Sequence, residues 1–389
     1  MKKNLLFLAL MLLISIHTMA QQALWGGSEI VSPEINDDNS VTFRLHAPHA
    51  NQVQLTGDWI PSEGWNPRLV EMKKTEDGLW IYTTKPLESN LYGYSFFVDK
   101  MRMNDPSNVY LIRDVATLTN VFIISGGQGD YYKVNDVPHG TVTRQWYHSP
   151  GNEKNRRITV YTPPGYESSG KDYPVLYLLH GMGGDEEAWM ALGRTSQILD
   201  NLIAQRKAEP MIVVMPNGNV YQEAAPGESS LGFVKPTMQL PNTMDGKMEE
   251  TFMDVINFVE SNYRVKQSSG ARAIAGLSMG GFHSLHISRY YPNTFHYIAL
   301  FSGAVFPAED ATSPVYKNFE ETLMNQKDNG YQLYWIAMGK TDFLYEQCVE
   351  LRKIMDRINM PYTYRESEGG HTWDNWRLYL TEFVPMLFK

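Results

Sequence analysis

The stretch that most constrains the fold is AIAGLSMGGFHS, residues 273–284, in which Ser278 stands between Gly276 and Gly280. It begins as a short apolar run, and a helix is expected to start near Gly281. Where a buried strand turns sharply into a helix, the residues two before and two after the apex meet neighbouring backbone, so side chains there would clash. The apex side chain is pushed out above the edge of the sheet. We therefore predict that Ser278 projects from the end of a central strand.

The rest of this region alternates strands with amphipathic helices. Near-continuous apolar runs are typical of parallel strands that are covered on both faces, and they occupy 175–179, 211–216, 272–276, 297–303 and 333–339. Apolar residues also repeat with helical spacing, as in Phe252, Val255, Ile256 and Val259, in Leu351, Ile354, Met355 and Ile358, and in Leu380, Phe383, Val384 and Leu387. This alternation predicts a doubly wound α/β sheet in residues 140–389.

An earlier region, residues 21–125, has the two-residue periodicity of β structure. Val41, Phe43 and Leu45 alternate with polar residues in VTFRLHAP, and turn-rich stretches separate similar segments. These features predict a small all-β, immunoglobulin-like sandwich. Residues 126–139 lose the alternation and gain glycine, aspartate and proline, so we expect them to form a linker.

Residues 1–20 predict a signal peptide. Lys2 and Lys3 precede an apolar stretch that ends at Ile16, and Ala20 supplies a small residue at the expected cleavage point. The apolar stretch is short for a membrane span, and no later one reaches about 18 residues. We expect a soluble protein that is exported to the periplasm or the extracellular space, without a membrane or lipid anchor.

Charge and cysteine content narrow the class of protein further. The formal net charge of −9 argues against a nucleic-acid partner. Cys348 is the only cysteine, so no internal disulfide can form. No motif that would supply a catalytic partner surrounds Cys348, and we expect a small buried residue on a helix.

A serine hydroxyl becomes a good nucleophile only when a base removes its proton, so the motif predicts a histidine and an orienting carboxylate later in the chain. Strand LYWIAMG leads into Asp342, and the segment YTYRESEGG leads into His371. Both therefore follow strands whose carboxyl ends should meet at one edge of the sheet. We predict Ser278 as nucleophile, His371 as base and Asp342 as its partner.

Other histidines and acids fit these roles less well. His180 ends an earlier strand, where a backbone-shaping role is expected. His283, His286 and His296 lie on or just after the helix behind the serine, which favours packing or surface roles. Among the acids, Asp310 and Asp328 belong to an irregular stretch, and Asp356 lies within an amphipathic helix.

The negative oxygen of a tetrahedral intermediate also needs hydrogen-bond donors. The backbone N–H of Met279, directly after the serine, is one candidate, and the loop HGMGG, residues 180–184, offers a second in Met182. The glycines of that loop would let it turn its amides inward. Such chemistry implies no metal and no organic cofactor.

Four motifs in this order, HGMGGDEEAW, AIAGLSMGGFHSL, MGKTDFLYEQ and GGHTWDNWRLYL, resemble the esterase-D-like branch of the α/β-hydrolases, which includes the feruloyl and acetyl-xylan esterases of the first carbohydrate esterase family. The resemblance covers roughly residues 140–389. It implies an α/β-hydrolase fold and the same roles for Ser278, Asp342, His371, Met182 and Met279.

The front region is similar to early-set, carbohydrate-binding-type modules of starch-branching and debranching enzymes, through VTFRLHAPHANQVQLTGDW, DGLWIY and YGYSFFVDKMRMNDPSN. Trp59, Trp65 and Trp80 could serve as glycan platforms or as core residues, so a purely structural sandwich is the alternative. Siderophore esterases of the enterobactin type also combine a front sandwich with this hydrolase domain.

The resemblance implies a secreted serine esterase, with hydroxycinnamoyl esters of xylan as the favoured substrate. Acetylated sugars, a siderophore ester and acyl transfer to a sugar remain alternatives, as does a glycan-binding protein with an inactive hydrolase domain. The long, turn-rich segment 219–247 is expected to wall the acyl pocket. The acyl group, the sugar backbone and the oligomeric state stay open at this point.

Overall fold

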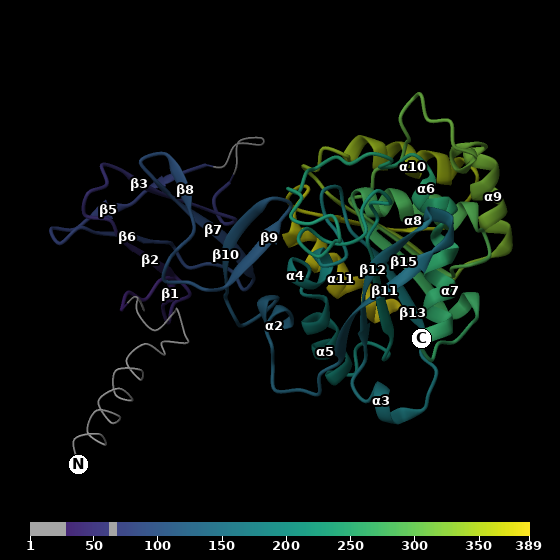
Figure 1. Ribbon diagram of the computed structural model, residues 1–389, viewed down its shortest axis with the longest axis horizontal. Coiled ribbons are helices and arrows are strands. Elements are labelled where there is room, and N and C mark those ends of the chain that lie inside the picture. Colours follow the sequence, from purple (N-terminus) through teal and green to yellow (C-terminus); the bar gives the residue numbers. More distant parts are fainter. Residues whose placement is uncertain (1–28, 62–67) are drawn as a thin grey trace, which may run out of the picture. The chain divides into compact units, whose positions relative to one another are not determined.

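A computed structural model describes residues 29–61 and 68–389 (Figure 1). The expected signal peptide, residues 1–20, and Trp65 lie outside these residues. The chain divides into two compact units, one made of Met1–Leu87 and Tyr94–Tyr110, the other of Glu88–Gly93 and Leu111–Lys389. None of the helices in the described residues is long and apolar enough to cross a membrane.

The front region is all β. One sheet has the order β1-β2-β6-β5 and the other the order β4-β3-β7-β10-β9, with β8 paired to β7. The pairings given for both sheets are antiparallel. The strands are β1 Glu34–Ile35, β2 Val41–His46, β3 Val53–Gly57, β4 Val70–Glu71, β5 Lys73–Lys74, β6 Leu79–Thr83, β7 Leu91–Val98, β8 Met101–Met103, β9 Leu111–Asp114 and β10 Thr117–Ile123. The predicted sandwich is confirmed.

Alternation along β2 builds its core as predicted, because Val41, Phe43 and Leu45 are all buried. Trp80 is a core residue: its side chain is 6% exposed, and its indole N–H donates to the Ala47 carbonyl. Trp59 is half-buried and stacks on Phe43. Neither ring is presented as a fully open platform.

The second unit is built on an eight-stranded sheet of order β11-β12-β14-β13-β15-β16-β17-β18. From β14 to β18 the pairings are parallel, whereas β11 and β12 are joined antiparallel. The strands are β11 Thr141–Ser149, β12 Lys154–Thr162, β13 Val175–Leu179, β14 Ile212–Pro216, β15 Arg272–Leu277, β16 Tyr297–Phe301, β17 Leu333–Gly339 and β18 Thr363–Ser367. The parallel strands β13 to β17 match the apolar runs, whereas β18 and the edge formed by β11 and β12 lie outside those runs.

Helices cover both faces of this sheet (Figure 1). Within the expected linker the chain forms α2 Gly129–Tyr132, and the other helices are α3 Tyr166–Ser169, α4 Ala188–Ala191, α5 Thr195–Ala204, α6 Lys247–Glu250, α7 Phe252–Asn262, α8 Met279–Tyr290, α9 Phe319–Asn329, α10 Tyr345–Arg357 and α11 Trp373–Phe383. Together with the sheet they form the predicted doubly wound α/β-hydrolase fold.

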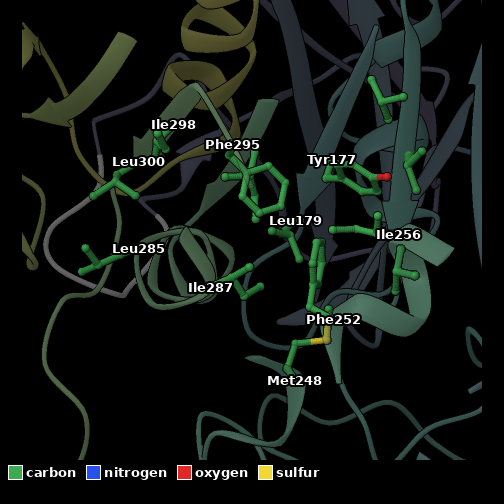
Figure 2. Packing of buried hydrophobic residues seen from close by; sticks show 14 of the residues in the cluster. Tyr177, Leu179, Met248, Phe252, Ile256, Leu285, Ile287, Phe295, Ile298 and Leu300 are labelled. Carbon is green, nitrogen blue, oxygen red and sulfur yellow. The ribbon is translucent and has the colours of Figure 1, made fainter. Parts of the chain in front are cut away.

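Alternate residues of each central strand enter different cores. Tyr177 and Leu179 belong to one apolar cluster with α7 and α8, and Leu176 and Leu178 belong to the other with α5 and α11. Figure 2 shows Phe252 of α7 packed among side chains of the first cluster. Both faces of these central strands are therefore buried. The site residues follow the carboxyl ends of strands in this sheet.

One helix prediction differs in detail from the structure. Leu380, Phe383, Val384 and Leu387 are all fully buried, but α11 ends at Phe383 and a 3₁₀ turn continues to Met386. Pro385, which lacks an N–H group, lies in that turn. Cys348 of α10 is buried as expected, and burial raises the pKa of its thiol to about 11.

Candidate active site

Ser278 lies at the apex between β15 and α8. Its φ of 52° and ψ of −114° lie outside the backbone regions that residues other than glycine adopt without strain. The backbone holds it there: Ser278 N–H donates to the Phe301 carbonyl, and the Ser278 carbonyl accepts from Phe282 and Ala304. Such a strained apex is typical of a nucleophile between a strand and a helix.

The flanking glycines are required by close backbone approach, as the sequence predicted. A Cβ on Gly276 would lie 2.3 Å from the Gly280 carbonyl oxygen, and a Cβ on Gly280 would lie 2.3 Å from that of Leu179. The turn therefore packs against the end of β13. The helix begins at Met279, two residues before the expected start.

Asp342 and His371 are brought together at the ends of neighbouring strands β17 and β18. The imidazole Nδ1 lies 2.9 Å from Asp342 Oδ2 and 3.0 Å from Oδ1. The Asp342 side chain has no exposed surface, and its Oδ1 also accepts from the Leu344 N–H. In the described residues the Ser278 hydroxyl makes no hydrogen bond to His371; such bonds often tighten only when substrate binds.

The turn that carries His371 is held by Asn375, a residue that the sequence analysis missed. Its amide donates to the carbonyls of Glu368 and Gly370, and its oxygen accepts from the Ser367 hydroxyl. No local pattern distinguishes this asparagine in the sequence, because its partners are defined only by the folded turn. Asn375 therefore restrains the backbone that directly precedes His371.

Aromatic rings surround the imidazole of His371. Phe343 lies 4.5 Å and Trp376 4.9 Å from it between ring centres. Trp376 is buried, whereas Phe343 is 59% exposed. The imidazole is thus packed on one side and bordered on the other by an apolar ring that solvent reaches.

The competing histidines and acids do not take part in the Asp342–His371 pair. The His180 ring bridges the Gly181 carbonyl and the Gly218 N–H at 2.8 Å each, and burial lowers its pKa. His283 and His286 are buried in packing positions. The alternative acids are exposed, namely Asp310, Asp328 and Asp356. Across residues 29–61 and 68–389, no group of His, Cys, Asp or Glu side chains is arranged to hold a metal ion.

Met182 and Met279 lie on the two segments that meet at the serine. Met279 is the first residue of α8, where helix N–H groups lack partners within the helix. In the described residues, the Met182 N–H donates no hydrogen bond either. A Cβ on the neighbouring Gly181 would lie 3.3 Å from Ser278 Cβ, so the loop 180–184 runs beside the serine.

Three consecutive acids, Asp185, Glu186 and Glu187, anchor that loop. Glu186 is fully buried and accepts from Arg157 Nε at 2.7 Å, from the Ala225 N–H at 2.8 Å and from the Asn217 amide. Burial raises the pKa of Glu186, while the hydrogen bonds from Ala225 and Arg157 oppose that shift.

Glu187 is held in a similar way. It accepts both Nε and Nη2 of Arg144 and also pairs with Arg157. The sequence analysis quoted the acidic triplet within a motif but assigned it no role, because its arginine partners lie on distant strands. These contacts restrain the segment that directly follows the loop 180–184.

The segment 219–247 begins beside the same anchors. Glu228 pairs with Arg157 at 2.8 Å, and Met238 lies close enough that its Sδ would be 2.9 Å from a Cβ on Gly183. Between these two residues, Phe233 is 97% exposed. The segment therefore reaches the loop 180–184 and carries apolar side chains in contact with solvent.

Comparisons with known proteins identify the families of both regions of the chain. A family model described as "putative esterase" matches residues 149–387, and a model of carbohydrate-binding module 48, the isoamylase N-terminal domain, matches residues 30–111. An endo-1,4-beta-xylanase/feruloyl esterase of Xylanibacter ruminicola is 30% identical over 369 residues. That alignment covers 92% of this chain and 46% of the relative, so the chain spans less than half of that protein.

Solved structures share the fold. A ferulic acid esterase is 26% identical, with a TM-score of 0.51 over 64% of this chain and 97% of its own. The enterobactin esterase of Shigella flexneri is 14% identical, with a TM-score of 0.63 over 89% of this chain and 92% of its own. Since the esterase model matches more than half of the chain and covers Ser278, Asp342 and His371, the chain belongs to the esterase family.

Proposed function

We propose that this protein hydrolyses carboxylic esters through an acyl-enzyme on Ser278. The observation that carries the proposal is the buried Asp342–His371 pair together with the strained Ser278 apex at the same sheet edge. Asp342 holds the Nδ1 proton of His371, so Nε2 is free to act as the base. A fluorophosphonate should label wild-type protein but not the Ser278→Ala variant, whereas an inactive glycan-binding protein would stay unlabelled.

The reaction proceeds in two steps. The Ser278 hydroxyl attacks the ester carbonyl while His371 takes its proton, and the resulting oxyanion accepts hydrogen bonds from the N–H groups of Met182 and Met279. The tetrahedral intermediate collapses, and His371 returns the proton to the departing alcohol. Water, activated by the same imidazole, then attacks the acyl-enzyme and releases the acid.

The favoured substrate is a feruloyl or related hydroxycinnamoyl ester on xylan. Support comes from the exposed Phe343 ring beside His371 and from the apolar residues of segment 219–247, which suit an aromatic acyl group. The names of the Xylanibacter relative and of the ferulic acid esterase structure point to the same substrate.

Two other ester classes stay as alternatives. Acetyl-xylan would need a smaller acyl pocket. A catecholate siderophore ester is favoured by the structural match to the enterobactin esterase, because that match covers 89% of this chain. A panel of methyl ferulate, acetylated xylan and a catecholate siderophore separates the three. Higher kcat/KM on acetylated xylan or on the siderophore than on methyl ferulate would replace the feruloyl proposal.

We further propose that the front module binds polysaccharide and that the protein acts outside the cytoplasm. The module matches a carbohydrate-binding family, but Trp80 is buried. Tyr110, which is 72% exposed, is the better candidate for stacking on a sugar. The Ser278→Ala protein should bind insoluble xylan, and adding Tyr110→Ala should weaken that binding. Unchanged binding would show that Tyr110 does not contact the polysaccharide.

A further inference from the structure

A hairpin that precedes the hydrolase sheet reaches the loop that carries Met182. β9 and β10 pair Asp114 with Thr117, so Val115 and Ala116 form the turn between them. Residues Leu111–Lys389 group with the second compact unit, although the carbohydrate-binding model ends at residue 111 and the esterase model begins at 149. Apart from Leu111, the hairpin therefore lies between the two matched regions and belongs to neither.

Arg113 of this hairpin anchors the first of the three acids. Its Nη2 lies 2.6 Å from Asp185 Oδ2, and the Asp185 side chain is 2% exposed. The other Asp185 oxygen accepts from the Glu187 N–H, so the carboxylate also shapes the end of the loop. Whereas the arginines of Glu186 and Glu187 come from β11 and β12, Asp185 receives its arginine from β9.

Val115 occupies the space over the residue that follows Met182. A Cβ on Gly183 would lie 2.8 Å from Val115 Cγ2, and Gly183 itself has a φ of 77°. Val115 has a φ of 50°, which strains a β-branched residue. The Arg113 Nη1, which donates to the Val115 carbonyl at 3.0 Å, holds this turn. The same guanidinium thus joins the strained turn to the loop.

We infer that Arg113 is a positioning residue for the oxyanion amide of Met182 and that Val115 keeps the adjoining Gly183 in place. This inference rests on the proposed ester hydrolysis. A loop with glycines at 181, 183 and 184 has few side chains to restrain it, so its anchors decide where its amides point. Oxyanion donors act only when they are held in place before the reaction.

The test uses the full chain with three single changes, Arg113→Met, Arg113→Lys and Asp185→Asn. A fourth protein combines Arg113→Met with Asp185→Asn. Arg357→Met is the matched control, because Arg357 pairs with Glu320 at an exposed site between α9 and α10. Methyl ferulate and 4-nitrophenyl acetate serve as small substrates, so polysaccharide binding does not enter. Thermal melting reports folding, and the fluorophosphonate labelling rate gives a second measure of the site.

We expect Arg113→Met to lower kcat about tenfold or more with little change in KM, since complete loss of one oxyanion donor costs about 10² to 10³. Arg113→Lys should recover part of the rate, and adding Asp185→Asn should cost little more because both changes break one contact. Wild-type kcat in Arg113→Met, or a loss equal to that in Arg357→Met, would overturn the inference.

If the arginine variants fold poorly, Val115→Gly tests the contact between the hairpin and the loop 180–184 instead. Glycine relieves the strain at positive φ, so the melting temperature should stay the same or rise, while kcat should fall several-fold as Gly183 loses its neighbour. A folded Val115→Gly protein with wild-type kcat would overturn the role of Val115. Wild-type protein that neither turns over an ester nor reacts with the fluorophosphonate would instead reject the proposed function itself.

Discussion

His371 Nδ1 lies 2.9 Å from Asp342 Oδ2 although 29 residues separate the two in the chain. The contact arises because β17 and β18 are adjacent parallel strands, so the residues that follow them meet at one edge. The carboxylate is fully buried and faces the imidazole with both oxygens. The pair can therefore hold one imidazole tautomer, with its proton on Nδ1.

Asp342→Asn should lower kcat on a small ester by something on the order of ten-thousandfold, as the equivalent change does in a serine protease. An amide at this position can donate to Nδ1, which would place the imidazole proton on Nε2, facing the serine. Steady-state kinetics on 4-nitrophenyl acetate would measure the loss. Asp356→Asn and Asp310→Asn, both at exposed positions, are the controls, and a larger loss in either would show that the acid is misassigned.

Ser278→Ala should lower turnover by at least about a thousandfold, because members of such a triad act as a unit and the remaining oxyanion hole gives only residual catalysis. Removing one hydroxyl from a half-buried side chain should leave the fold intact. Circular dichroism and melting would check the fold alongside the kinetics. Retained turnover in a folded variant would end the serine-hydrolase proposal.

Gly276→Ala should destabilise the protein, by about 1–3 kcal/mol or more, because its Cβ would lie 2.3 Å from the Gly280 carbonyl oxygen. Backbone on both sides of the turn would have to move. Gly270→Ala is the matched control, since the nearest atoms to its Cβ would lie 3.8 Å away. Denaturant unfolding of both variants measures the difference, and equal free energies of unfolding would contradict the close approach.

His286 should make the protein less stable as the pH drops below about 6.5, the ordinary pKa of histidine. Burial, together with the positive charge of Arg289 and proximity to His283, holds the pKa of His286 well below that value. The folded state keeps His286 neutral, because its Nε2 faces the Val305 carbonyl and its Nδ1 accepts from Arg289. The unfolded chain gains a proton that the folded chain does not, so acid favours unfolding by up to about 1.4 kcal/mol per pH unit.

His286→Gln tests whether His286 causes this pH dependence of stability, because an amide can keep both hydrogen bonds without titrating. The free energy of unfolding, measured between about pH 7 and pH 5, should depend less on pH in this variant than in wild type. His180, whose pKa is also lowered by burial, would account for part of the remaining slope. His148→Gln at an exposed position is the control, and equal slopes in wild type and His286→Gln would show that His286 contributes nothing.

Local sequence was enough to predict the elements that carry the site. Close backbone packing around a strand-to-helix turn leaves room only for glycine, so Gly276 and Gly280 marked the Ser278 apex. Apolar runs buried on both faces marked the parallel strands β13 to β17, and Asp342 and His371 were predicted because each follows a segment that reads as a strand. These inferences depend on short-range sterics and on periodicity, which a sequence displays directly.

Only the tertiary structure decided what holds the site in place. Arg113 and Asp185 lie 72 residues apart, and Arg157 meets Glu186 across 29, so no local pattern pairs them. Asn375 has partners only once the turn before His371 is formed. Long-range ion pairs and hydrogen bonds depend on which surfaces the fold brings together, and a charged residue on a strand looks the same in the sequence whether it faces solvent or a buried carboxylate.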